Sequence, residues 1–160
     1  MTKLQLFQLI LAKLRDDLEM AKTAALTAYE AATHEESIAE NKYDTLGLEA
    51  SYLAAGQSRR VHELENALTA CQNLTLAHFE THSPIQLSAL IELEDAQGKT
   101  RWLFIAPDAA GLKVHDGIKE VLVISPQSPM GQALKGKFCG EEVKLYHSQG
   151  TSQFTIINIY

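Results

Sequence analysis

The sequence predicts an α+β protein in which an antiparallel helical hairpin, a coiled coil, precedes a small antiparallel β module with one short helix. Two observations support this fold class. Apolar residues recur at heptad spacing through the first 75 residues, and after residue 85 they alternate or form short runs. Turn-forming glycines and prolines punctuate the second part, as is typical of strands. We expect the hairpin at 1–75, a linker at 76–84 and the β module at 85–160.

Composition narrows the classes of function. The 160 residues are 46% apolar and 21% charged, which is ordinary for a globular protein and argues against disorder. The formal net charge of −6 gives no whole-molecule attraction to nucleic acid, so we expect no sequence-specific DNA binding. Cys71 and Cys139 show no metal or disulfide spacing. The apolar N-terminal segment is too short to cross a bilayer and has no cleavage site. We therefore expect a cytoplasmic protein with free thiols and no membrane partner.

The first helix is predicted by an unbroken heptad seam. Its apolar residues are separated by alternating steps of three and four, which places them on one helix face. Leucine and phenylalanine occupy the first half of the seam and alanine the second, so we expect a hairpin that is thick at its base and slender at its tip. The seam consists of Leu4, Phe7, Leu11, Leu14, Leu18, Ala21, Ala25, Ala28 and Ala32.

The far end of the hairpin is acidic. Between Glu30 and Glu49 the chain carries six acids and one lysine, Lys42. Two overlapping S/T-x-x-E patterns, at 33–36 and 37–40, fit capping boxes that would satisfy the exposed N–H groups of a helix start. The acids therefore have two interpretations: they cap the second helix, or they form the working end of the hairpin. The acidic tip lies near 33–44.

A second seam predicts the returning helix. It starts from Tyr43, is interrupted near Gln57 and Arg60, and ends near residues 71–73. Because the two seams have similar length and flank a turn, an antiparallel intramolecular hairpin is favoured over a parallel dimer. The apolar positions are Leu46, Ala50, Leu53, Leu64, Ala67, Cys71 and Leu74.

The C-terminal part is predicted to be mainly antiparallel strands at 85–93, 100–106, 120–124, 142–146 and 153–160. A short helix at 128–134 begins with Ser-Pro, which suits a first helical turn. His78 and His82 are four residues apart, but no third ligand completes a metal site and Pro84 breaks the helix. We therefore expect no metal bound by the protein alone.

Residues 124–143, ISPQSPMGQALKGKFCGEEV, resemble the pattern I-S-x-x-S-P-h-G-x-A-L-h-G-K-x-x-G-D-E-V, in which h is hydrophobic. This pattern belongs to the Gre family (GreA/GreB) of bacterial transcript-cleavage factors. The closing segment TIINIY is similar to the last strand of that family. The order of hairpin and β module agrees with it as well, so the resemblance covers the whole chain.

The resemblance implies an FKBP-like β module that docks on RNA polymerase near the mouth of the secondary channel, with Ser128, Pro129, Met130 and Gly131 as the candidate docking surface. It implies that the hairpin enters this channel. There the tip acids would help to hold the second Mg²⁺ that hydrolyses backtracked RNA. The partner is then RNA polymerase, with nascent RNA contacted indirectly, and the protein is no independent enzyme and has no tightly bound cofactor.

The tip of the family resembles G-D-x-S-E-N-A-E-Y-D, whereas residues 36–44 read ESIAENKYD, without the glycine and one residue shorter between E-N and Y-D. We expect Glu36 and Glu40 to direct the metal, with Glu35 and Asp44 supporting, because residues four apart share a helix face and carboxylates suit Mg²⁺. Two alternatives remain: a regulator that occupies the channel without cleavage, and a coiled-coil adaptor that self-associates through the seam. A prolyl isomerase is suggested by fold analogy alone.

Overall fold

The computed structural model describes residues 1–34, 38, 40 and 45–160. It divides into two compact units: Lys13–Leu68, and Met1–Ala12 together with Thr69–Tyr160. Helix α1 (Lys3–Thr33) and helix α2 (Leu46–Gln72) contribute residues to both units. The chain divides at residues 12/13 and 68/69, whereas we expected boundaries near residues 75 and 84. The difference arises because the first turns of α1 pack with the strands.

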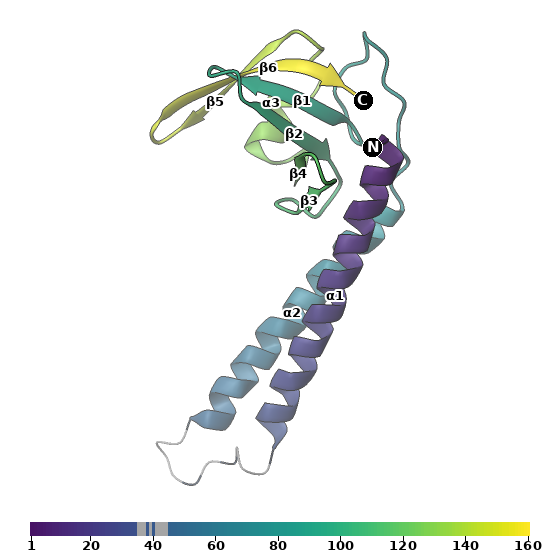
Figure 1. Ribbon diagram of the computed structural model, residues 1–160. Helices are drawn as coiled ribbons and strands as arrows, with labels where there is room; N and C mark the ends of the chain where they lie inside the picture. The colour runs from purple at the N-terminus through teal and green to yellow at the C-terminus, as the bar shows by residue number, and fades with distance from the viewer. Residues whose placement is uncertain (35–37, 39, 41–44) are drawn as a thin grey trace. The chain divides into compact units, whose positions relative to one another are not determined.

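The unit formed by residues 13–68 is an antiparallel helical hairpin, which confirms the predicted N-terminal architecture (Figure 1). The middle of the predicted α1 seam is buried in the hairpin as the spacing predicts, but its start is not: Leu4 is 56% exposed, and Phe7 packs against Phe104 of the sheet instead. The buried residues are apolar and recur every three or four positions, so one face of each helix is removed from water. Its buried members are Leu14, Leu18, Ala21 and Ala28 on α1 and Leu64 and Ala67 on α2.

Two residues of the predicted second seam are exposed. Leu46 and Leu53 keep 56% and 57% of their surface exposed. The seam of α1 consists of alanines over the corresponding stretch, and a methyl group covers too little surface to bury a leucine. Apolar spacing alone therefore overstated the burial of this half of α2.

The start of α2 also differs from the expectation. The helix begins at Leu46, three residues after Tyr43, and the Thr45 hydroxyl donates to the Glu49 carboxylate at 3.1 Å. Thr33 caps no helix start, because it is the last residue of α1 and its hydroxyl donates to the Tyr29 carbonyl at 3.0 Å. Of the second proposed box, at 37–40, Ser37 and Ala39 lie outside the described residues.

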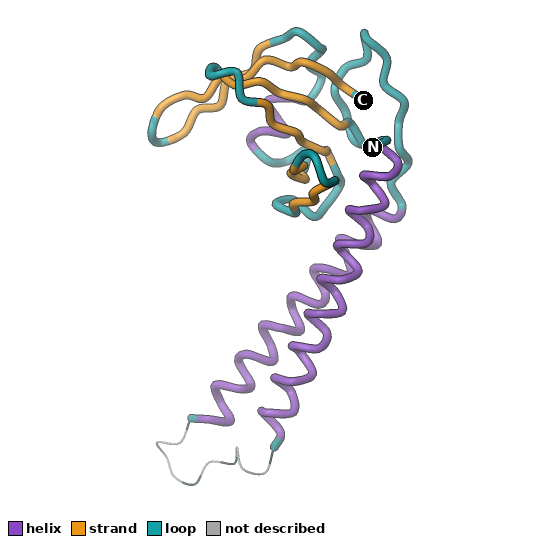
Figure 2. The backbone as a smooth tube through the Cα atoms, viewed as in Figure 1, coloured by secondary structure: helices purple, strands orange, loops and turns teal. Residues whose placement is uncertain are grey.

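Within residues 69–160 of the described chain, six strands form one sheet in the order β3-β4-β2-β1-β6-β5. Figure 2 shows these strands in orange and the short helix α3 (Pro129–Leu134) in purple. The predicted combination of a hairpin with a small β module and one short helix is thus confirmed. The strands are β1 (Leu90–Asp95), β2 (Thr100–Ile105), β3 (Lys113–His115), β4 (Glu120–Ile124), β5 (Glu142–His147) and β6 (Gly150–Ile159).

The sheet is mixed rather than wholly antiparallel. Strand β4 pairs with β2 in parallel, with Leu103 opposite Leu122. Strand β3, which the sequence did not predict, forms an antiparallel pair with β4 and reverses the chain once between β2 and β4. Three residues are too few to show a strand period, which is why β3 was missed.

The first strand begins later than predicted, at Leu90 instead of residue 85. Ser88 interrupts the extended backbone with a φ of 72°. This conformation is held by the fully buried side chain of Ser88, whose oxygen accepts a hydrogen bond from the Ala77 backbone at 2.8 Å. A local polar contact therefore overrides the apolar pattern of residues 85–89.

The two faces of the sheet are covered differently. Side chains alternate along β2, so Leu103 and Ile105 join the buried cluster that contains Leu134 of α3. Phe104 points to the other face and contacts Phe7 of α1, with ring centroids 6.0 Å apart. The first turns of α1 therefore complete the core of the β module.

Lys3 ties three segments of this unit together. Its ammonium group donates to the carbonyl oxygens of Ala77 and Tyr160 and lies 4.5 Å from the centre of the Phe79 ring. Partial burial lowers the pKa of Lys3. The start of α1, the linker and the end of β6 are thereby joined.

We predict that Phe7→Ala lowers the free energy of unfolding by about 3–5 kcal/mol, because it removes a buried ring and leaves a cavity against Phe104. Urea unfolding of the full chain measures this. Leu4→Ala is the matched control, since Leu4 is one turn away and 56% exposed; its effect should stay within about 0.5 kcal/mol. Equal effects of the two variants would contradict the role given to Phe7.

Candidate functional site

The structure describes one of the four predicted tip acids. Glu40 is exposed to solvent. Glu35, Glu36 and Asp44 lie outside the described residues. The metal-directing role of these acids stays a prediction.

The predicted docking segment, Ser128–Gly131, forms the start of α3. Ser128 is the N-cap: its hydroxyl oxygen accepts from the Gly131 backbone at 3.0 Å and donates to the Ser125 carbonyl at 2.8 Å. Pro129 occupies the first helical turn, where its missing N–H leaves no hydrogen bond unmade. The sequence Ser-Pro thus fixes where α3 begins.

Gly131 is required by close packing. It is buried, and a Cβ atom at this position would overlap the Ser125 carbonyl oxygen. Ser128 and Gly131 therefore build the turn. Pro129, which is exposed, and Met130, which is half-buried, are the members of the segment that a partner can touch.

Met130 borders a groove of about 650 Å³ that is lined mainly by residues of β2 and β4. We call it the β2–β4 groove. Its volume falls in the range of pockets that hold ligands or the side chains of a partner, about 300–1,000 Å³. Its apolar lining includes Leu103 from β2, Leu122 and Ile124 from β4, and Met130 from α3.

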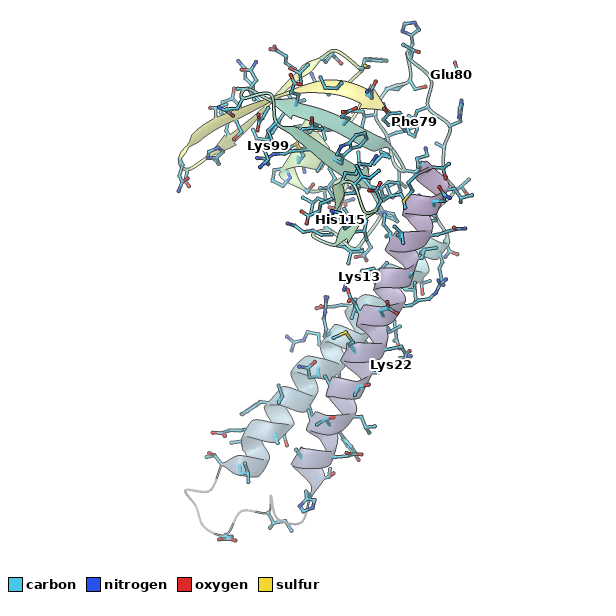
Figure 3. All side chains as sticks on the ribbon, viewed as in Figure 1. Lys13, Lys22, Phe79, Glu80, Lys99 and His115 are labelled. Carbon is cyan, nitrogen blue, oxygen red and sulfur yellow. The ribbon has the colours of Figure 1, made fainter. Side chains whose placement is uncertain are left out.

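The rim of the β2–β4 groove is basic. Lys99, Arg101, Lys113 and Lys119 line it, together with Glu120. Figure 3 shows Lys99 beside the start of β2. Lys113 is paired with Glu120 at 2.9 Å, and the Lys119 ammonium lies 3.7 Å from the centre of the Trp102 ring. Sequence reasoning missed this site, because its residues come from three strands, one of them the unpredicted β3.

The β3–β4 turn, residues 116–119, contributes Ile118 and Lys119 to the lining of the groove. The Asp116 carboxylate accepts hydrogen bonds at 2.9 Å from the backbones of Ile118 and Lys119, and these bonds lower the pKa of Asp116. The ring of His115, on β3 in Figure 3, accepts from the Gly117 backbone at 3.0 Å. The signal in the sequence was Asp-Gly followed by an isoleucine, a turn pair next to an apolar residue.

Other kinds of site find no support in the described residues. Among them no three histidine, cysteine or acidic side chains gather as metal ligands. None of the described helices combines the length and apolar character of a membrane span. Both cysteines are free thiols, Cys71 buried and Cys139 exposed.

Comparison with known proteins identifies the family. The model of the family "Transcription elongation factor, GreA/GreB, C-term" matches residues 81–160, which contain the β2–β4 groove and the Ser128–Gly131 segment. The chain belongs to the GreA/GreB family. Transcription elongation factor GreA of Syntrophus aciditrophicus is 30% identical over 118 residues, which are 69% of this chain and 68% of that protein.

Solved structures with similarity to this member of the GreA/GreB family include two homologues of GreA factor, called Gfh1. The Gfh1 proteins of Thermus thermophilus and Thermus aquaticus are each 24% identical, with TM-scores of 0.40. The first match covers 94% of both chains, and the second covers 93% of this chain and 92% of the other. A GreA/GreB factor from Nitrosomonas europaea is 16% identical over 60% of this chain and 78% of its own, with a TM-score of 0.38.

We predict that Gly131→Ala destabilises the protein by about 1–3 kcal/mol, because the added methyl group forces the backbone at Ser125 to move. Gly56→Ala is the matched control: nothing lies within 4 Å of a Cβ at Gly56, and in a helix the change should stabilise by about 0.5–1 kcal/mol. Urea unfolding should show opposite signs. A neutral Gly131→Ala would contradict the close packing described above.

Proposed function

We propose that this GreA/GreB-family protein binds RNA polymerase, inserts the hairpin into the secondary channel and stimulates cleavage of backtracked RNA by the polymerase. The observation that carries the proposal is the family match over the β module, combined with a long helical hairpin in front of it. The protein itself is then no enzyme. It supplies carboxylates to an active site that the polymerase already has.

The chemistry assigned to the tip follows from metal catalysis. Hydrolysis of a phosphodiester by two metals requires one ion to activate water and another to stabilise the leaving oxygen. Mg²⁺ keeps several waters and needs only one or two protein carboxylates. Glu36 and Glu40 would hold the second Mg²⁺ in the polymerase active site, with Glu35 and Asp44 raising the local negative charge.

The form of the hairpin suits this role. Helix α1 has 31 residues, which corresponds to about 46 Å at about 1.5 Å per residue. Alanine replaces leucine along the half of its seam that leads to the tip, so the seam between the two helices holds few bulky side chains there. A slender helical pair can pass through a narrow opening.

The β module would hold the factor on the polymerase surface. Pro129 and Met130 are the accessible residues of the predicted docking segment, and Met130 also lines the β2–β4 groove. Because Ser128 and Gly131 fix the turn, the two accessible side chains are presented in a defined position. We assign Ser128–Gly131 to partner binding on this basis.

A second candidate function is a regulator that occupies the channel without stimulating cleavage. The observation in its favour is the tip sequence, in which residues 36–44 are one residue shorter than the family pattern and lack its glycine. If Glu40-Asn41 is aligned with the E-N of the pattern, Ser37 replaces its aspartate. One of the two acids of the family pattern would then be missing from the metal site.

We predict that the protein shortens labelled RNA from its 3′ end in a stalled, backtracked polymerase complex with Mg²⁺. Glu36→Ala/Glu40→Ala should slow this cleavage by at least about 10–100-fold, since that is the loss caused by removing only the outer-shell partners of a metal. Glu63→Ala/Glu65→Ala is the control, because it removes the same charge from positions of α2 away from the tip, one exposed and one half-buried.

The outcomes separate the candidate functions. Cleavage that only the tip variant loses supports the proposal. RNA that is not cleaved, but is protected from an added GreA factor, identifies the non-cleaving regulator. If the protein causes neither cleavage nor protection, this result contradicts binding in the channel and favours a coiled-coil adaptor.

A further inference from the structure

Ile118 is the most exposed large apolar residue among those described, with 90% of its surface open to solvent. Single exposed apolar residues are common and indicate nothing by themselves. Ile118, however, also lines the β2–β4 groove. Its side chain therefore extends an apolar surface that is already concave.

The turn that carries Ile118 is held rigidly. The Asp116 backbone donates to the Lys119 carbonyl at 3.1 Å, and the Asp116 carboxylate accepts from the backbones of Ile118 and Lys119. Gly117 adopts a φ of 92°, which residues with side chains rarely adopt. An apolar side chain on a preorganised turn loses little conformational freedom on binding, which favours affinity.

Charge indicates what kind of segment fits. Four basic side chains line the β2–β4 groove, against Glu120 in the lining and Asp116 in the adjacent turn. This local excess of positive charge contrasts with the net charge of −6 for the chain. Complementary charges steer association and select the partner. A basic rim around an apolar floor suits a segment with one apolar face and flanking carboxylates.

We propose that the β2–β4 groove and Ile118 bind an acidic, amphipathic segment of RNA polymerase, with Ile118 as the apolar anchor and Lys99 as a contact for its carboxylates. The inference rests on the proposed function, since it names the chemistry of the polymerase surface that the β module recognises. It adds residues outside the Ser128–Gly131 segment to the docking surface. It also assigns specificity to strand β3 and its turn.

The test is the affinity of the full-length protein for immobilised polymerase core enzyme at two salt concentrations. Ile118→Ser should raise the Kd about ten-fold or more, as expected for a central apolar anchor, whereas Ile118→Leu should keep the Kd within about two-fold. Lys99→Glu should raise the Kd and reduce its dependence on salt.

Matched controls come from β5, at the opposite edge of the sheet. Tyr146→Ser changes a residue that is 81% exposed, and Lys144→Glu reverses an exposed charge; both should leave the Kd unchanged. Circular dichroism and the urea midpoint establish that each variant is folded.

The experiment distinguishes failure of the proposed function from failure of this inference. If the unaltered protein does not bind polymerase, the proposed function and this inference both fall. If it binds and Ile118→Ser binds equally well, only the inference is overturned. If the β5 variants weaken binding as much as the groove variants, the groove is not the selective surface and the inference is overturned as well.

Discussion

The packing of the first turns of α1 against the sheet is the interaction on which the rest of the structure depends. Leu6, Phe7 and Ile10 are buried, and Phe7 contacts the fully buried ring of Phe104. Without α1, this face of the sheet would expose its aromatic residues to water. Because the same helix continues into the hairpin, one continuous element supplies core residues to both compact units.

The two regions of the chain to which we assign a function, the segment between the helices and the β2–β4 groove, carry charges of opposite sign. Six acids lie between Glu30 and Glu49, whereas basic side chains line the β2–β4 groove. Carboxylates are the ligands that Mg²⁺ requires, and the basic rim suits acidic protein surface. The negative net charge of the chain therefore conceals a locally basic groove on the β module, which composition alone could not reveal.

The heptad seam and the strand alternation predicted the fold class, because burial of one face imposes a period on any helix or half-buried strand. Features set by contacts between distant segments were not predictable in this way. Leu46 and Leu53 fit the period but face alanines that cannot cover them. Strand β3 is too short to show a period, although it sets the parallel pairing of β2 with β4 and supplies part of the β2–β4 groove. Of the candidate site, the sequence indicated the Ser128–Gly131 segment and the acidic tip, but not the basic rim.

The most direct test of channel insertion is photocrosslinking from the hairpin. A photoreactive phenylalanine analogue at Leu48, an exposed residue in the first turns of α2, should form crosslinks to the walls of the polymerase secondary channel in a backtracked complex. The same analogue at Tyr146 on β5 should form none there. Crosslinks from Leu48 only to the outer surface of the polymerase, or none at all, would contradict the account.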